Sequence, residues 1–411
     1  MHEATGAPVL LIGWYAKAVE AFETLGRRVV CAVTPTDLAA AQQVDSGAEF
    51  VVVPDTSSVE DVLAGLARAE LAPEDFAAIC SMREFSLVTA SALSGLAGRP
   101  GLGLRTALAL RDKYLQKRMV RAAGIPVADC RTVSSLGELA QQDWRGPVVV
   151  KPLAGGAARD TCVIGSPEAL RSAVDAGQGA AEKGPWLVED FVEGPEIHVD
   201  GIVSGGEVTF LSVSRYLQNV IAIKSGGVVG SVVVDPADGL YARAGELTRA
   251  ALAALGHRDG IFHLEAFVQD HGLVFSECAG RIGGGLIRDV VAHQFGVSLV
   301  EAWARAALGE PYRPSGTVRG GTTGFVHLPA PPGRVAHLPT TADILDRPGC
   351  VTARVDAREG REMPDVTVGS NVKAGRVMVV GEDEEQVEAR IGELVAWFRS
   401  AVAVQGTGAE R

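Results

Sequence analysis

The sequence predicts a three-domain protein that combines α/β and α+β organisation, and three observations support this fold class. Short apolar runs alternate with helical stretches up to about residue 104. A cluster of turn-forming residues, Pro100-Gly101-Leu102-Gly103, follows them, and proline and glycine become frequent again from about residue 311. A chain of 411 residues is also too long for one ordinary core. We therefore expect domains at residues 1–104, 105–310 and 311–411.

The first domain reads as a parallel sheet covered by helices. Its apolar strand candidates are residues 9–13, 28–33, 50–54 and 77–81. Continuous apolar strands that alternate with helices are typical of a parallel sheet buried on both faces. The first strand leads into Gly13-Trp14-Tyr15 and lacks the G-x-G-x-x-G pattern of a dinucleotide site. The pattern thus favours a Rossmann-like layer without its usual cofactor.

The other two domains read as α+β. A single helix is expected over residues 107–124, because Gly124 and Pro126 provide an end signal. Extended segments are expected at residues 131–133, 147–151, 161–164, 186–192 and 196–203, and further along at 323–328 and 376–380. The last helix shows one apolar face, formed by Val387, Ile391, Leu394 and Phe398.

Composition limits the partners and the compartment. The formal net charge of −12 argues against nucleic acid or an anionic membrane as the main partner. The six cysteines form no C-x-x-C pair, so neither a disulfide framework nor a structural zinc site is expected. We find no signal peptide and no apolar stretch long enough to span a membrane. A cytoplasmic protein that acts on small molecules is expected.

Two acids in the stretch HLEAFVQDHGLVFSECAGR give the sharpest chemical inference. Apolar runs flank Asp270-His271-Gly272, which suits a three-residue hairpin loop, and that register sets Glu265 directly opposite Glu277. Like charges that face each other across a sheet are destabilising, and carboxylates in apolar strands need a counter-charge. A divalent cation such as Mg²⁺ satisfies both needs. The alternative is that one glutamate pairs with Arg281 while the other is solvated.

Lys151 ends an apolar strand and precedes a glycine-rich loop. The loop contains Gly155, Gly156 and Thr161, and its small residues expose backbone N–H groups that suit phosphate. It is not a Walker A loop. Taken alone, a lysine placed like Lys151 is more often a surface residue of a hairpin, and Lys113 alone reads as a solvated helix lysine.

Two further segments suit a nucleotide and a reaction centre. The stretch from Trp186 to Glu196 carries Glu189 and Glu196. The backbone of this strand edge could pair with adenine, and a carboxylate could accept hydrogen bonds from the ribose hydroxyls. The alternative is an ordinary edge strand followed by a turn. Arg281 precedes Gly283-Gly284-Gly285, where a guanidinium could stabilise charge on a transferring phosphoryl group.

Taken in order, these motifs resemble the ATP-grasp superfamily, and within it the carboxylate–amine ligases of the L-amino-acid ligase type. The matching segments are RDKYLQKRMVRAAGIPVAD, VVVKPLAGGAARDTCVI, VEDFVEGPEIHVDG, GIFHLEAF and SECAGRIGGG. The resemblance implies a Rossmann-like pre-ATP-grasp domain, an ATP-grasp domain of two α+β subdomains with a lid over roughly residues 125–192, and a small C-terminal α+β domain.

The resemblance also implies roles for individual residues. ATP phosphates would contact Lys113 and Lys151 under a lid formed by loop 155–161. Glu189, Phe191 and Val192 would hold adenine, and Glu196 would hold ribose. Glu265 and Glu277 would bind Mg²⁺, with Mn²⁺ as the alternative ion. Arg281 would be the catalytic arginine. A carboxylate, an amino acid or a similar small acid, would take the γ-phosphoryl group, and an amine would then displace phosphate.

One departure and the substrate residues leave alternatives open. Many relatives read E-x-N-x-R at the metal site, but Ala279 occupies the asparagine position, which puts a second Mg²⁺ in doubt. A phosphotransferase or carboxylase, or a nucleotide-binding protein with a degenerate site, are the competing readings. Substrate contacts are expected from Arg83, Glu84, His263 and Arg288. A structural, hydrogen-bonded role is equally expected for His263, and a plain surface position is equally expected for Arg288. The resemblance further implies a homodimer.

Overall fold

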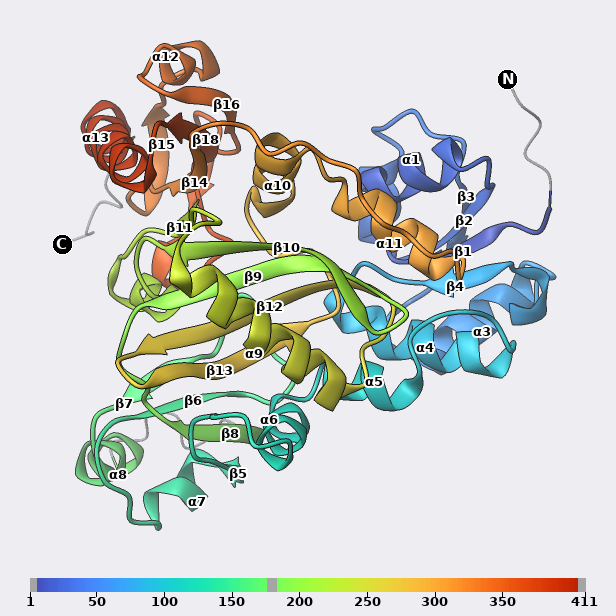
Figure 1. Cartoon of the computed structure of the whole chain (residues 1–411), viewed down its shortest axis with the longest axis horizontal. Helices are drawn as coiled ribbons and strands as arrows, with labels where there is room; N and C mark the ends of the chain where they lie inside the picture. The colour runs from blue at the N-terminus through green and yellow to red at the C-terminus, as the bar shows by residue number, and fades with distance from the viewer. Residues whose placement is uncertain (1–5, 176–182, 406–411) are drawn as a thin grey trace.

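The computed structural model describes residues 6–175 and 183–405, and the strands of these residues form four sheets (Figure 1). The N-terminal layer is a parallel sheet in the order β3-β2-β1-β4. Its strands and helices are β1 (Val9–Ile12), β2 (Val29–Val33), β3 (Glu49–Val52), β4 (Ala78–Cys80), α1 (Ala16–Thr24), α2 (Pro35–Ala41), α3 (Val59–Arg68) and α4 (Leu87–Leu96). The predicted Rossmann-like layer is thereby confirmed.

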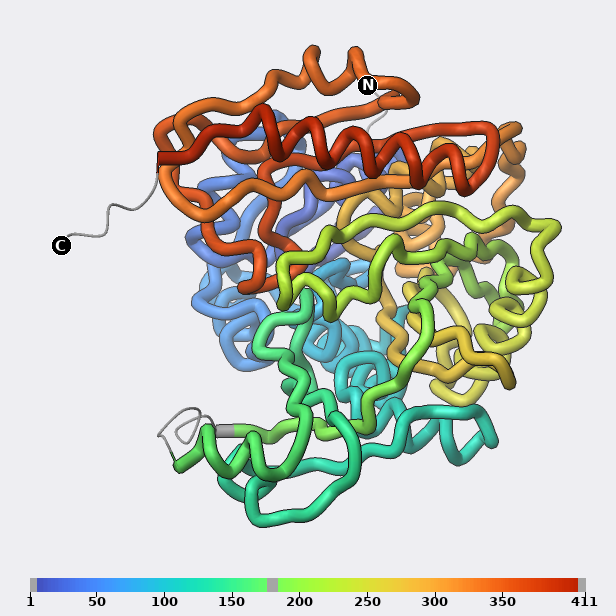
Figure 2. Tube along the Cα trace, turned by 90° about the vertical axis from the view of Figure 1, so that its left-hand side faces the viewer, coloured from blue at the N-terminus to red at the C-terminus, as the bar shows by residue number. Residues whose placement is uncertain are grey.

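A small antiparallel sheet forms a second body, at the bottom of Figures 1 and 2. Its order is β5-β8-β6-β7, and the helices α7 and α8 pack against each other beside it. The elements are β5 (Cys130–Ser135), β6 (Val148–Pro152), β7 (Cys162–Ile164), β8 (Lys183–Asp190), α7 (Leu136–Ala140) and α8 (Pro167–Asp175). Branched apolar side chains of β5, β6 and β8 form its own small core with Trp186.

The centre is an eight-stranded sheet in the order β13-β12-β9-β10-β11-β14-β18-β16. These strands are β9 (Glu196–Ser204), β10 (Glu207–Tyr216), β11 (Gly230–Val233), β12 (Gly260–Gln269), β13 (Gly272–Ala279), β14 (Thr322–Leu328), β16 (Cys350–Val355) and β18 (Gly375–Gly381). The helices packed on it are α9 (Gly239–Leu255), α10 (Ile287–Phe295), α11 (Leu299–Ala307) and α13 (Glu384–Ala401). The C-terminal strands therefore continue the central sheet.

The remaining C-terminal elements form a short sheet, and its order is β17-β15-β19. They are β15 (Gly333–His337), α12 (Thr341–Leu345), β17 (Glu362–Met363) and β19 (Ala403–Gln405). The apolar face predicted for the last helix is confirmed, since Val387, Ile391, Leu394 and Phe398 of α13 are all buried. No helix among the described residues is long and apolar enough to cross a membrane.

The prediction of one helix over residues 107–124 is wrong in one respect, because the structure has two helices there. They are α5 (Leu104–Ala109) and α6 (Lys113–Ala122). Between them Asp112 adopts an extended backbone and its side chain accepts a hydrogen bond from the Leu115 N–H at 2.8 Å. A carboxylate at this position satisfies an unpaired N–H of the new first turn, which favours a fresh start of the helix. The break places Lys113 at the first position of α6.

Candidate active site

The hairpin β12–β13 brings the two predicted metal ligands together. Glu265 lies directly opposite Glu277 in the sheet, as the sequence predicted. The loop, however, is not the expected three-residue loop, because Gly272 already pairs with Gln269. A β-bulge beside Glu265 leaves Ser276 without a cross-strand partner and restores the register. The shorter loop and the bulge compensate, so the glutamates still face each other.

The bulged edge strand is held by α6. The Lys117 ammonium donates to the carbonyl of Ser276 at 2.8 Å, and this is the carbonyl of the bulged residue. Gln116 bonds both backbone groups of Cys278, at 2.8 Å to its N–H and 2.7 Å to its carbonyl. Cys278 is buried on the core face of its strand. Side chains of one helix thus replace the missing neighbour of an edge strand and fix the position of Glu277.

A cavity of about 280 Å³ collects most of the predicted site residues. Its walls come from α6, the small sheet, the central hairpin and the C-terminal strands. The predicted residues that line it are Lys113, Lys151, Gly155, Gly156, Thr161, Glu189, Phe191, Val192, Glu196, His263, Glu265, Glu277 and Arg281. The fold therefore assembles segments that are far apart in the chain around one space.

Three lysines of the cavity are paired with glutamates. Lys113 lies 3.2 Å from Glu277, and its ammonium also donates to the carbonyl of Gly155 in the glycine-rich loop at 3.2 Å. Burial alone would raise the pKa of Glu277, but the charges of Lys113 and Lys151 outweigh it and lower the pKa to about 2. The Glu277 carboxylate is therefore ionised at neutral pH.

Glu189 is shared by two buried lysines. Its carboxylate lies 2.5 Å from Lys151 and 2.9 Å from Lys117. Burial would raise the pKa of Glu189, but the two ammonium groups reverse this and lower it. Burial lowers the pKa of Lys117, whereas for Lys151 the charges of Glu189 and Glu277 outweigh burial and raise the pKa. The side chain of Glu189 is thus occupied by cations and holds Lys151 in the cavity.

The segment after Glu189 and the side chain of Glu196 form the next part of the wall. The Phe191 N–H donates to the carbonyl of Pro147 at 3.1 Å. Glu196 accepts from the Val220 N–H at 2.8 Å, at the start of a 3₁₀ segment. Burial and then the charge of Glu265 raise the pKa of Glu196 to about 8. A proton on Glu196 therefore relieves the crowding of carboxylates in the ligand-free site.

We expect the ligand-free protein to lose stability through Glu196 as the pH rises. The folded-state pKa is raised above the usual 4.5, so the folded state keeps a proton that the unfolded chain releases between about pH 4.5 and 8. Glu196→Gln should remove this dependence, which amounts to at most about 1.4 kcal/mol per pH unit. Urea unfolding at pH 5, 7 and 9 measures it. A stability difference between the two proteins that does not change with pH would contradict the expectation.

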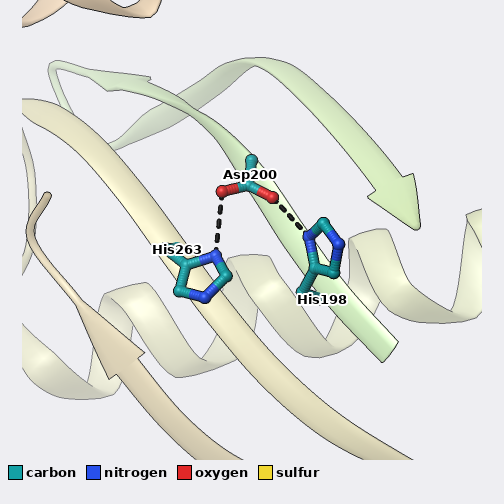
Figure 3. A group of neighbouring side chains, drawn as sticks. All are labelled: His198, Asp200 and His263. Carbon is teal, nitrogen blue, oxygen red and sulfur yellow. Dashed lines mark hydrogen bonds and ion pairs between the residues drawn. The ribbon is translucent and has the colours of Figure 1, made fainter. Parts of the chain in front are cut away.

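Two histidines and an aspartate, His198, His263 and Asp200, form a buried network (Figure 3) that reaches Glu265 through His263. Nδ1 of His198 lies 2.6 Å from Asp200 and Nδ1 of His263 lies 2.9 Å from it. Burial would lower the pKa of His263, but Asp200 reverses this and raises it to about 10. Nε2 of His263 lies 3.4 Å from Glu265.

The network is satisfied by hydrogen bonds and orients the metal-ligand candidate. Nε2 of His198 lies 2.8 Å from the hydroxyl of Ser231, so both its ring nitrogens have partners. The Tyr216 hydroxyl donates to Glu265 at 2.8 Å. The three residues could also offer ligand atoms to a metal, but their nitrogen and oxygen atoms already bond one another. The arrangement therefore suits the orientation of Glu265 rather than a separate metal centre.

Arg281 is anchored by the N-terminal layer. Its Nε donates to Glu84, and Glu84 also accepts from Arg111 at 2.7 Å. One guanidinium nitrogen of Arg281 donates to the carbonyl of Ile282 at 2.9 Å. Glu84, expected as a substrate contact, is thus engaged by two arginines and positions Arg281 at the cavity.

The two arginines predicted to contact the substrate, Arg83 and Arg288, do not line this cavity. Arg83 pairs with Asp37 at 2.5 Å. Arg288 lies 2.8 Å from Asp289 and also donates to the hydroxyl of Tyr15. His263 does line the cavity, although its Nδ1 is occupied by Asp200.

The donor set around Glu265 and Glu277 fits a hard cation. Both carboxylates line the cavity from facing strands, and oxygen ligands of this type are those that Mg²⁺ prefers. The charge of Glu265 raises the pKa of neighbouring Glu196, which shows that negative charge accumulates on this side. Ala279 lies two residues beyond Glu277 on the same face of the strand and offers no oxygen.

Several cavity residues were missed by the sequence reasoning. Lys117 had a signal, since it lies four residues after Lys113 on the same helical face. Others include Tyr216, Asn219, Phe325, His327, Ser370, Asn371 and Lys373. They come from β10 and the segment after it, from β14 and from the loop before β18, and no local pattern connects these segments.

Comparisons with known proteins agree with this geometry. Residues 118–284 match the family model of the ATP-grasp domain. The L-arginine-specific L-amino acid ligase of Bacillus subtilis is 29% identical over 351 residues, which cover 83% of this chain and 84% of that protein. The fold is similar to that of the L-amino acid ligase from Bacillus licheniformis, with a TM-score of 0.76 and 18% identity over 98% of this chain and 100% of that one.

A second solved structure shows how widely the fold is used. N5-carboxyaminoimidazole ribonucleotide synthetase from Thermotoga maritima superposes with a TM-score of 0.69 and 19% identity, over 97% of this chain and 100% of that one. Similarity at this level concerns the fold alone. Together, the comparisons identify an ATP-grasp domain at residues 118–284 and show that the chain is similar, over most of its length, to an L-amino acid ligase.

Proposed function

We propose that the protein uses Mg-ATP to join a small carboxylic acid, an amino acid or a close analogue, to an amine through an acyl phosphate. The observation that carries the proposal is the facing pair Glu265 and Glu277, set in one cavity with three glutamate-paired lysines and Arg281. The names of the relatives, both L-amino acid ligases, support the substrate class.

In this proposal the nucleotide lies between the small sheet and the central sheet. The backbone around Phe191 and Val192 would contact adenine, while Glu196 would accept from the ribose hydroxyls. Loop 155–161 would cover the phosphates, with Gly155, Gly156 and Thr161 facing them and with Lys113 and Lys151 as their cations. Glu189 would act through Lys151, because its carboxylate is held by Lys151 and Lys117. The division into domains at residues 1–104, 105–310 and 311–411 is part of this proposal, and the small sheet would be the lid.

The chemistry would follow in two displacements. A carboxylate oxygen of the acid attacks the γ-phosphorus, the bond to the bridging oxygen breaks, and ADP leaves with its electron pair. The amine nitrogen then attacks the acyl carbon, loses a proton and expels phosphate, which leaves an amide bond. A bound Mg²⁺, held by Glu265 and Glu277, would neutralise phosphate charge. Arg281 would stabilise the charge that develops on the transferring group.

The position of Ala279 favours one protein-held metal ion. Its methyl side chain stands where many relatives carry an asparagine ligand, so a second ion would depend on water and phosphate oxygens. Glu265, Glu277 and Arg281 nevertheless all face the cavity, which argues for a working site rather than a degenerate one.

The reaction can be tested with isotopes. The protein is incubated with ATP, Mg²⁺ and the twenty L-amino acids carrying ¹⁸O in their carboxylates, and products are analysed by mass spectrometry. We expect ADP, a new condensed mass and ¹⁸O in the released phosphate, because one carboxylate oxygen leaves with it. A phosphorylated acid as the only product would indicate a phosphotransferase. No ADP release with any amino acid would overturn the proposal.

A further inference from the structure

One wall of the cavity is built by C-terminal strands and has no assigned role. It consists of Phe325 and His327 on β14 together with Ser370, Asn371 and Lys373 in the segment before β18. The five carboxylates among the lining residues, Glu189, Asp190, Glu196, Glu265 and Glu277, all come from other walls. The C-terminal wall therefore adds a cation and no acid to the cavity.

His327 presents buried ring nitrogens to this space. Only 6% of the residue is exposed, and neither nitrogen has a hydrogen-bond partner of normal geometry among the described residues. The backbone of Ser370 offers the ring one poorly aligned hydrogen bond, which acts to raise the pKa of His327. Burial and then the charge of Lys373 lower its pKa to about 3, so the ring is neutral. A Cβ atom placed on Gly285 would lie 3.0 Å from Nε2. The ring therefore adjoins the glycine loop that follows Arg281.

A buried polar group without a well-aligned hydrogen bond is costly, so this exception calls for an explanation. A neutral imidazole always carries one N–H that can donate, whichever tautomer it adopts. An acceptor on a bound molecule would satisfy it.

Lys373 supplies a positive charge on the same wall. It is half-buried, and its ammonium donates to the carbonyl of Asn371 at 3.0 Å. No carboxylate lies within ion-pair range of it in the described chain, whereas Lys113, Lys117 and Lys151 each pair with a glutamate. Asp356, the acid that acts on it from a distance, is already paired with Arg354 and Arg376. The wall is thus prepared for an anion from outside the protein.

The neighbouring loop adds to this charge. The Ser370 N–H donates to the carbonyl of Ala157 at 3.1 Å, so the C-terminal wall contacts loop 155–161 directly. Arg159 of that loop packs near Gly369 and is exposed. A ligand on this wall would lie under the same loop as the nucleotide.

We propose that Lys373 and His327 bind the free carboxylate of an α-amino acid that serves as the amine substrate. This inference rests on the proposed ligase function. The acid that is activated must bring its carboxylate to the γ-phosphate, and in the proposed function the lysines and glutamates of the other walls surround that phosphate. A separate anion-binding wall would therefore hold a second carboxylate, one that does not react. The product would then be a dipeptide with a free C-terminal carboxylate, not the amide of a simple amine.

An internal competition tests the inference. The protein, ATP and Mg²⁺ are mixed with equal amounts of the twenty L-amino acids and of their carboxamides, and condensed products are sorted by mass into those ending in a carboxylate and those ending in an amide. Because the loss of a charged hydrogen bond lowers affinity about tenfold or more, we expect acid-ended products to exceed amide-ended ones by about that factor. Lys373→Met should bring the ratio close to one, and Lys373→Arg should restore part of it.

The outcomes separate this inference from the proposed function. Arg334→Met serves as the matched control, since Arg334 is an exposed C-terminal cation on β15 that does not line the cavity, and it should keep the wild-type ratio. Equal use of acids and carboxamides by the wild type, or an unchanged ratio in Lys373→Met, would overturn the carboxylate subsite while the ligase remains. A mixture in which no condensed product forms, and in which hydroxylamine also traps no hydroxamate, would overturn the proposed function itself.

Discussion

Glu277→Gln and Glu265→Gln are each expected to lower turnover by about a thousandfold or more. The two carboxylates face each other across β12 and β13 and line the same cavity as Arg281. A glutamine keeps the shape of the side chain but removes a charged ligand, and metal ions at phosphoryl centres supply several kcal/mol of charge stabilisation. The loss should therefore appear mainly in kcat.

Metal binding provides a second measurement for the same variants. Titration of Mn²⁺ in the presence of ADP, followed by electron paramagnetic resonance, should show weaker binding in both. Asp270→Asn is a suitable control, because Asp270 is an exposed carboxylate at the tip of the same hairpin. Wild-type turnover and Mn²⁺ affinity in both glutamine variants would show that the metal assignment is wrong.

The structure also changes the expected effect of these variants on stability. The sequence showed only two like charges in apolar strands, which predicts that removing one would relieve repulsion. In the structure Glu277 lies 3.2 Å from Lys113 and is further compensated by Lys151. We therefore expect Glu277→Gln to destabilise the ligand-free protein, because it leaves buried lysines with less compensation.

Arg281→Met is expected to lower kcat by about a hundredfold to a thousandfold. Charge-stabilising donors at reaction centres have effects of this size when removed. The KM for ATP should change much less, because the lysines of the cavity remain. Arg281→Lys should recover little, since a lysine cannot reproduce both the contact with Glu84 and the donor to the Ile282 carbonyl.

Steady-state kinetics with saturating amino acids measure this split. Arg105→Met is the control, because Arg105 is an exposed arginine on α5 that does not line the cavity. If the arginine variants raise KM for ATP but leave kcat unchanged, Arg281 binds the nucleotide and does not stabilise the transferring group.

The facing glutamates illustrate how far local patterns reach. The prediction that they would meet rested on a hairpin loop one residue too long, and the two acids face each other because the bulge at Ser276 offsets the shorter loop. The bulge at Ser276 could not be predicted from the hairpin, because it depends on Lys117 of α6, which donates to the carbonyl of that residue. A cation from another element stabilises the irregularity that aligns the two acids.

Glu189 and the division between α5 and α6 show the same limit. Propensity favours one continuous helix, and only the capping bond from Leu115 to Asp112 reveals the break that directs Lys113 to the cavity. The side chain of Glu189 could be assigned to a nucleotide from its strand, but not to Lys117 and Lys151, because both approach it from separate elements.

The parallel N-terminal layer, the hairpin that carries Glu265 and Glu277, and the resemblance to ATP-grasp enzymes could be read from the sequence, because strand alternation, turn residues and motif order are local properties. The tertiary structure alone decided which cations neutralise the acids, how Glu84 anchors Arg281, and that His327 and Lys373 share the cavity. These depend on contacts between segments separated by a hundred residues or so, such as β14 beside β11 in one continuous sheet. Burial and charge compensation arise only when such segments pack together.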